Sequence, residues 1–216
     1  MSKLGKNRLG RLLTAMVTPF DARGEVDYQQ AKKLALALLD SGSDGVVVSG
    51  TTGESPTLSR EEKLRLFAET KSALGKRGTV IAGTGSYNTK ESQELTKEAE
   101  ITGVDACLLV VPYYNRPTQQ GLWEHFKAIA QSTTLPCIIY NVPSRTVTSI
   151  AADTIIKMSQ IDNIVGVKEA SGNLGEIAGI IQGTKKDFLV YSGNDSDTFP
   201  ILALGGYGVI SVASHL

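Results

Sequence analysis

Lys168 stands at the end of an apolar run, Ile164-Val165-Gly166-Val167. A run without polar alternation is typical of a strand buried on both faces of a parallel sheet. At the carboxyl end of such a strand, desolvation lowers the pKa of the lysine amine and favours the neutral form, which attacks carbonyl carbons. The pattern therefore suggests Schiff-base chemistry. The alternative is that Lys168 marks the point where the strand reaches the surface, with its amine in water.

Polar and aromatic residues also follow other apolar runs. Hydroxyls and backbone N–H groups at Thr51 and Thr52, which lie between two glycines, suit a small carboxylate. Tyr140 could pass protons during imine formation if it lies near the lysine. Arg145 could hold a second carboxylate in a bidentate grip. Further candidates at strand ends are Tyr113, Tyr114, Asn115, Asn141 and the run Ser192-Gly193-Asn194-Asp195.

Each of these residues also has a purely structural interpretation. The Gly-Thr-Thr-Gly segment could be a turn whose hydroxyls cap the following helix. Tyr113 and Tyr114 could be packing aromatics in a loop. Arg145 could be an ordinary surface charge, so only convergence of the groups in space would favour chemistry.

Apolar runs alternate with segments of helical spacing along the whole chain. Around 59, Ser59 and Glu62 form the capping-box pattern of a helix start. The expected strands are 12–17, 45–49, 79–82, 106–111, 137–141, 164–168, 188–192 and 208–212. The expected helices are 28–39, one that begins at Ser59, 89–102, 119–132, 151–159, 174–182 and one near 197–204.

This alternation predicts an α/β fold, either a doubly wound sheet or a closed (β/α)8 TIM barrel. The count of eight strands favours the barrel, formed by residues 1–216 as one domain. In such a barrel the active site lies at the carboxyl ends of the strands, where all the candidates above are expected to meet. The chain stops soon after the eighth strand, so we expect a barrel that lacks the last helix. This would expose an apolar strip to water, so we expect either that the chain is cut short or that a partner covers the gap.

Composition narrows the classes of function. The 22 basic residues balance 22 acidic ones, and the only basic cluster is the short start with Lys3, Lys6, Arg8 and Arg11. Nothing favours nucleic acid or an anionic membrane as a partner. The sequence has neither an apolar stretch of membrane-spanning length nor the pattern of a secretory signal, so we expect a cytoplasmic protein.

Cofactor motifs are also missing from the sequence. Cys107 and Cys137 lie inside apolar runs, where cysteine usually acts as a small hydrophobic residue. His125 falls in an amphipathic helix and is expected to be structural. The segment Gly83-Thr84-Gly85 lacks the third glycine and the acidic residue of a dinucleotide fingerprint. No Cys/His cluster supports a zinc site.

Four motifs in order resemble the dihydrodipicolinate synthase family of class I aldolases. They are Gly50-Thr51-Thr52-Gly53-Glu54, Pro112-Tyr113-Tyr114-Asn115, Tyr140-Asn141-Val142-Pro143 with Arg145, and Gly166-Val167-Lys168-Glu169-Ala170-Ser171-Gly172. The resemblance runs in register from about Leu12 to Leu216. The same superfamily contains N-acetylneuraminate lyase and 2-keto-3-deoxygluconate aldolase.

The resemblance implies a role for each matched residue. Lys168 would form the imine with pyruvate, Tyr140 would relay protons, and Thr51 would link Tyr140 to Tyr114 of a neighbouring subunit. Arg145 would bind the carboxylate of L-aspartate 4-semialdehyde. The residues expected to hold pyruvate are Thr52, Gly193 and the carbonyl region of Ile210.

The resemblance further implies that pyruvate condenses with L-aspartate 4-semialdehyde to 4-hydroxy-tetrahydrodipicolinate, in lysine and diaminopimelate biosynthesis. No metal or diffusible cofactor would be needed, and a homo-oligomer, dimer or tetramer, would share Tyr114 between sites. Arg145 and Tyr114 favour this reaction over those of the related aldolases. Family members carry a helix and a helical C-terminal extension after the eighth strand, and this sequence has neither. An inactive or structural truncated fragment is therefore the other alternative.

Feedback by lysine is expected to be weak or absent. Lysine-sensitive members of the family tend to carry histidines and an asparagine where this chain has Arg60, Lys63 and Tyr87. Extra cations at those positions would oppose the binding of a cationic amino acid.

Overall fold

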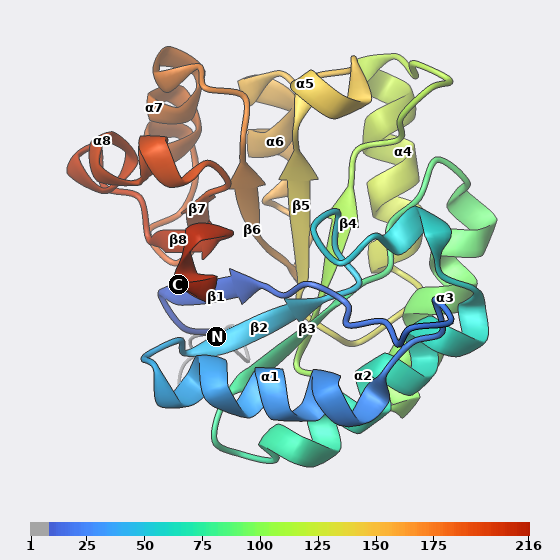
Figure 1. The fold of residues 1–216 in the computed structure, drawn as a ribbon. Coiled ribbons are helices and arrows are strands. Elements are labelled where there is room, and N and C mark those ends of the chain that lie inside the picture. Colours follow the sequence, from blue (N-terminus) through green and yellow to red (C-terminus); the bar gives the residue numbers. More distant parts are fainter. Residues whose placement is uncertain (1–8) are drawn as a thin grey trace.

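A computed structural model describes residues 9–216, so Lys3, Lys6 and Arg8 of the basic start lie outside the described residues. Eight parallel strands close into a barrel in the order β1 to β8 (Figure 1). The strands are β1 (Leu12–Ala15), β2 (Gly45–Val48), β3 (Thr79–Gly83), β4 (Ala106–Val110), β5 (Cys137–Asn141), β6 (Ile164–Glu169), β7 (Leu189–Ser192) and β8 (Gly208–Ser211). The closed order confirms the (β/α)8 interpretation over the doubly wound sheet.

Helices lie outside the strands (Figure 1). The α-helices are α1 (Tyr28–Asp40), α2 (Arg60–Leu74), α3 (Thr89–Ile101), α4 (Gln119–Ala130), α5 (Pro143–Thr146), α6 (Ala152–Met158), α7 (Leu174–Gly183) and α8 (Thr198–Ala203). Short 3-10 turns are η1 (Ser55–Thr57), η2 (Asp195–Asp197) and η3 (Ala213–His215). The capping box at Ser59 and Glu62 is present at the start of α2, as predicted.

Side chains pack on both sides of the barrel wall, which explains the apolar runs in the strands. All four residues of β2 are buried, for example. One cluster fills the barrel interior and includes Leu13, Ile138, Tyr191 and Ile210. Two larger clusters lie between strands and helices. Strand ends therefore have fixed positions, and the loops that follow them are held on a rigid frame.

The barrel closes through parallel pairing of β1 with β8, where Leu13 lies opposite Ile210. The chain after β8 forms only η3 before Leu216. Within residues 9–216, no helix has both the length and the apolar character needed to cross a membrane.

The structure corrects several predicted element ends. Strand β1 ends at Ala15, two residues before Val17, which is 40% exposed and donates its N–H to the Nε2 atom of His215. The short helix α5 was not predicted at all, although Pro143 at its first position is typical of a helix start. The predicted helix at 151–159 forms as α6, one residue shorter at each end.

Candidate active site

Lys168 and Tyr140 lie side by side at the carboxyl ends of β6 and β5. The strands pair with Tyr140 opposite Lys168, and the Nζ atom of Lys168 lies 4.3 Å from the centroid of the Tyr140 ring. Lys168 is only 5% exposed, so the surface-lysine alternative is wrong. Burial lowers the pKa of the Lys168 amine to about 8. The nearby Asp195 carboxylate raises this pKa, whereas the Arg145 guanidinium lowers it further.

This pKa makes the amine usable as a nucleophile. At pH 7, about one Lys168 amine in ten is neutral, against fewer than about one in a thousand for an unperturbed lysine. Within residues 9–216 Lys168 makes no ion pair, so no carboxylate in direct contact holds the proton in place. A desolvated amine against an aromatic ring is suited to attack on a carbonyl.

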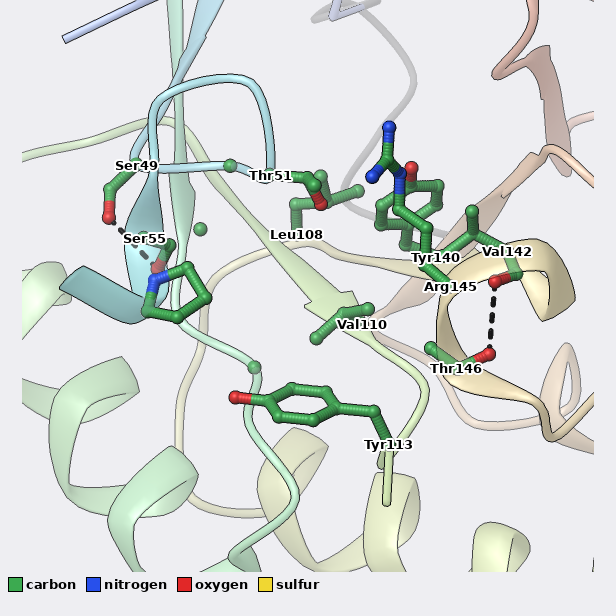
Figure 2. Close-up of a pocket in the computed structure, with 14 residues that line it drawn as sticks. Ser49, Thr51, Ser55, Leu108, Val110, Tyr113, Tyr140, Val142, Arg145 and Thr146 are labelled. Carbon is green, nitrogen blue, oxygen red and sulfur yellow. Dashed lines mark hydrogen bonds between the residues drawn. The ribbon is translucent and has the colours of Figure 1, made fainter. Parts of the chain in front are cut away.

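Tyr140 joins Lys168 to an open cavity. Burial raises the pKa of the Tyr140 phenol, whereas hydrogen bonding with the Thr51 side chain and the charge of Arg145 lower it. The phenol therefore keeps its proton near neutral pH and can donate it to a developing alkoxide. Figure 2 shows Arg145 beside Tyr140, with Thr51 on the facing side of the cavity.

The cavity has a volume of about 260 Å³ and opens at the carboxyl end of the barrel. Its size is suited to small metabolites rather than to a polymer. Four of the candidate residues line it, namely Thr51, Tyr113, Tyr140 and Arg145. The other lining residues are Ser49, Gly50, Ser55, Pro56, Gly83, Gly85, Leu108, Val110, Val142 and Thr146.

The short helix α5 directs Arg145 toward this cavity. Its turn is fixed by the Arg145 N–H, which donates to the Val142 carbonyl, and by the Thr146 hydroxyl, which donates to the same carbonyl at 3.0 Å (Figure 2). The Thr146 hydroxyl also lies 2.7 Å from the Thr148 carbonyl. Arg145 makes no ion pair within residues 9–216, so its guanidinium is available to a carboxylate ligand.

Gly193 lies against the lysine stem. A Cβ atom at this position would come within 3.1 Å of the Lys168 Cε atom and 2.8 Å of the Ala170 Cβ atom, so only glycine allows this close approach. Its N–H donates to the Glu169 carbonyl, which ties β7 to the end of β6. Asp195, two residues later, accepts hydrogen bonds from the N–H groups of Val212 and Ala213 and so joins the loop after β7 to the end of β8.

Five of the residues given roles by the resemblance lie apart from the cavity lining, namely Lys168, Gly193, Thr52, Ile210 and Tyr114. Thr52 is half-buried next to Thr51, and Ile210 is fully buried in the barrel interior. Tyr114 is 93% exposed with a φ of 70°, a strained value for a tyrosine. Its neighbour Tyr113 lines the cavity instead and packs edge-on against Tyr87, with ring centroids 5.2 Å apart.

Sequence reasoning missed some of the lining. Ser49 and Ser55, whose hydroxyls lie 3.2 Å apart, form part of the wall, as do Val142 and Thr146. Val142 could have been found, because it lies two residues beyond Tyr140 and alternate residues of an extended segment share a face. The serines carry no such pattern, since they border a loop in which Ser49 has a φ of 55°.

The cysteine expectation holds, whereas His125 is buried but its Nε2 atom has no hydrogen-bond partner within residues 9–216. Cys107 and Cys137 are free and buried in the outer core, where burial raises the pKa of the Cys107 thiol to about 12. His125 shares a hydrogen bond with the Thr89 hydroxyl at 2.8 Å, and burial lowers its pKa to about 4. Residues 9–216 contain no group of three or more His, Cys, Asp or Glu side chains arranged to hold a metal ion.

Comparison with known proteins fits this arrangement. Residues 8–216 match the dihydrodipicolinate synthetase family. The chain belongs to that family. A relative named 4-hydroxy-tetrahydrodipicolinate synthase from Dehalococcoides mccartyi strain 195 is 68% identical over 96% of this chain and 70% of its own length.

Solved structures of the dihydrodipicolinate synthetase family share the fold. The dihydrodipicolinate synthase crystal structure from Bacillus anthracis is 51% identical, with a TM-score of 0.95 over 96% of this chain and 71% of that chain. The chloride-inhibited enzyme from Acinetobacter baumannii, complexed with pyruvate, is 42% identical, with a TM-score of 0.94 over 96% of this chain and 72% of that chain. The chain thus spans about 70% of the length of these relatives.

Proposed function

We propose that the chain condenses pyruvate with L-aspartate 4-semialdehyde to 4-hydroxy-tetrahydrodipicolinate, through an imine on Lys168, as a class I aldolase. The observation that carries the proposal is the buried Lys168 amine, with its lowered pKa, 4.3 Å from the ring centroid of Tyr140. Family membership supports the same reaction, since the relatives carry that enzyme's name. One of the solved relatives is complexed with pyruvate.

The first half of the reaction forms the nucleophile. The neutral Lys168 amine adds to the ketone carbon of pyruvate, and the resulting carbinolamine loses water to give the imine. Loss of a proton from the methyl carbon of pyruvate then gives an enamine. Tyr140, beside the amine, is the group that carries protons to and from these intermediates.

The second half makes the carbon–carbon bond and the ring. The enamine carbon attacks the aldehyde carbon of the semialdehyde, and the alkoxide takes a proton from Tyr140. The amino group of the semialdehyde then displaces the Lys168 amine from the imine carbon, which closes the ring and frees the enzyme. One water is released overall, and the proposal requires no metal and no diffusible cofactor.

We assign the two substrate carboxylates to opposite sides of the site. Thr52 and Gly193, with the carbonyl region of Ile210, would hold pyruvate next to Lys168. Arg145, which lines the cavity without an ion pair among the described residues, would hold the carboxylate of the semialdehyde. A guanidinium suits this task because its planar fork matches a carboxylate.

The proposal is tested by incubating the chain with both substrates and identifying the product by mass spectrometry. In Arg145→Ala the apparent KM for the semialdehyde should rise far more than that for pyruvate. Lys185→Ala, on the loop before β7, is a matched control that removes a cation from the other end of the barrel. Equal changes in both KM values in Arg145→Ala would contradict the assigned role.

Assembly is part of the proposal. We infer a homo-oligomer in which Tyr114, with its 93% exposed side chain, completes the site of a neighbouring copy. Tyr114→Phe should slow turnover by roughly a hundredfold. Sedimentation should show a dimer or tetramer in the active preparation, and a fully active monomer would contradict the shared site.

Lysine inhibition is expected to be weak or absent. Arg60 pairs with Glu98 at 2.7 Å and with Glu94 at 3.3 Å, and Lys63 is half-buried near Glu91. Cations at these positions would oppose the binding of a cationic amino acid. The initial rate should stay unchanged in millimolar lysine, and a marked loss of rate would disprove the prediction.

A further inference from the structure

Asn141 and Glu169 each follow a proposed catalytic residue, and their side chains meet on the outer side of the barrel wall. Tyr140 and Val142 line the cavity inside the barrel, whereas Asn141 and Pro143 line a second, polar cavity of about 350 Å³ that shares no residue with the first. Strand alternation explains this division. Both side chains are almost completely buried, although they carry an amide and a carboxylate.

Both oxygens of the Glu169 carboxylate accept hydrogen bonds. Its Oε1 atom accepts from the Asn141 Nδ2 atom at 2.7 Å, and its Oε2 atom accepts from the Ser171 hydroxyl at 2.6 Å. Such charge-assisted bonds are stronger and geometrically more demanding than neutral ones. Burial raises the pKa of Glu169, and these hydrogen bonds oppose the rise.

The Asn141 amide also holds the far end of the segment that carries Arg145. Its Oδ1 atom accepts from the Ile150 N–H at 3.1 Å, nine residues along the chain, and its Nδ2 atom lies 3.4 Å from the Ser149 hydroxyl. The segment 142–150 leaves β5 and returns to it, with α5 in its first half. It contains Val147 in the left-handed region at a φ of 61°, a conformation that needs support from its surroundings.

We propose that Asn141 and Glu169 are positioning residues for the condensation. They act as one brace that sets the segment carrying Arg145 against the strand pair carrying Tyr140 and Lys168. The inference rests on the proposed function. It extends that function to two residues that touch no substrate and that line the second cavity, behind the active site.

Exchanging the amide of Asn141 and the carboxylate of Glu169 between the two positions gives a direct test. Asn141→Asp keeps the acceptor for the Ile150 N–H but sets a second carboxylate against Glu169. Two carboxylates in contact either repel each other or take up an extra proton, and both states disturb the contact. Adding Glu169→Gln restores the hydrogen bond between the two side chains. The amide at 169 now donates, and the carboxylate at 141 accepts.

Asn141→Asp should lower kcat/KM for the semialdehyde by roughly tenfold or more, mainly through its apparent KM, because small misplacements of a binding group are costly. The apparent KM for pyruvate should change less. The double variant should recover most of the loss. Asn141→Ser, an uncharged and shorter side chain, should raise the same KM. Kinetic constants within twofold of the wild type in both single variants, or no recovery in the double variant, would overturn the proposal.

A second readout does not depend on activity. Backbone amide hydrogen exchange in 142–150 should be faster in Asn141→Asp and return toward the wild-type rate in the double variant. Unchanged exchange would overturn the brace by itself. Absence of a borohydride-trapped pyruvate adduct on the wild-type chain would instead contradict the proposed function, so the two failures are distinguishable.

The matched control lies at the other end of the barrel. Glu100 is also a carboxylate held by hydroxyl donors, Thr133 and Thr134, at the end of α3. Glu100→Gln should leave both KM values and the exchange of 142–150 unchanged. Changes equal to those of Asn141→Asp would show that any lost carboxylate contact loosens the barrel, which would contradict a specific brace.

Discussion

The two ends of the barrel differ in the partners of particular charged side chains and in where strained backbone conformations occur. At the amino-terminal end, Lys71 contacts Asp105 at 2.7 Å, and the Arg11 guanidinium lies 5.0 Å from the Tyr207 ring centroid. At the carboxyl end, Lys168 and Arg145 have no ion-pair partner within residues 9–216. Lys168 and Arg145 are thus left available for ligands, whereas Lys71 and Arg11 are held by their neighbours.

Backbone strain follows the same division. Every non-glycine residue with positive φ in 9–216 lies on a loop that follows a strand at the carboxyl end, namely Ser49, Glu54, Tyr114, Arg116 and Val147. Strained conformations persist only where the surroundings enforce them, and they cluster at functional sites. Turns at the amino-terminal end reach positive φ with glycines such as Gly42 and Gly103, where the conformation costs little.

The largest expected effect comes from removing the amine. Lys168→Met keeps much of the side-chain volume, so it should lower turnover on the order of 10⁴-fold or more, as for other lost nucleophiles. Thermal unfolding should occur at an equal or higher temperature, because a buried amine has been replaced by an apolar group. A large drop in unfolding temperature would show that Lys168 stabilises the barrel, and the contrast between the two ends would fail.

Tyr140→Phe should come next in size. It keeps the ring against the lysine but removes the phenol, so turnover should fall by roughly a hundredfold or more while the pyruvate adduct still forms. Steady-state rates and reductive trapping measure the two effects separately. Wild-type turnover in this variant would refute the proton relay.

A core truncation at the other end should reverse the pattern. Leu13→Ala removes a fully buried side chain from the barrel interior and should lower the free energy of unfolding by about 2–5 kcal/mol. The rate per folded molecule should stay close to that of the wild type. Denaturant unfolding and activity below the transition measure both quantities, and a large loss of specific activity without a loss of stability would break the comparison.

The smallest expected effect is a shift in pH dependence. Imine formation needs the neutral amine, so its rate should rise with pH and level off above the Lys168 pKa of about 8. The Asp195 charge raises this pKa and the Arg145 charge lowers it. Asp195→Asn should therefore move the rise to lower pH, and Arg145→Leu should move it to higher pH.

Adduct formation from about pH 6 to about pH 10, quenched with borohydride at fixed times, measures these shifts. Thr133→Ala, a substitution at the amino-terminal end, is the control and should leave the profile in place. Shifts in the same direction for the Asp195 and Arg145 variants would contradict the electrostatic account.

The sequence predicted the barrel because each strand and most helices carry a local pattern. Lys168 was found because a charged residue interrupts an apolar run, and the structure confirms its burial. Helix α5 was missed because four residues are too few to show helical periodicity. The effect of Asp195 on Lys168 was not predictable either, since it depends on how the loop after β7 folds back toward β6.

The Asn141–Glu169 contact shows the same limit. Both residues stood within the motifs, but which face of the wall they occupy depends on the strand register and on the return of 142–150 to β5. Residues matched by a motif can act on substrate or on each other. Only the three-dimensional arrangement separates the two cases.

The most direct test of the account is reductive trapping. The chain is incubated with pyruvate and borohydride, its intact mass is measured, and the modified peptide is mapped, with Lys168→Met as the control. We predict a single reduced pyruvyl group on Lys168 and none on the control. No adduct on the folded wild-type chain, or an adduct on another lysine, would contradict the claim that this desolvated amine is the nucleophile.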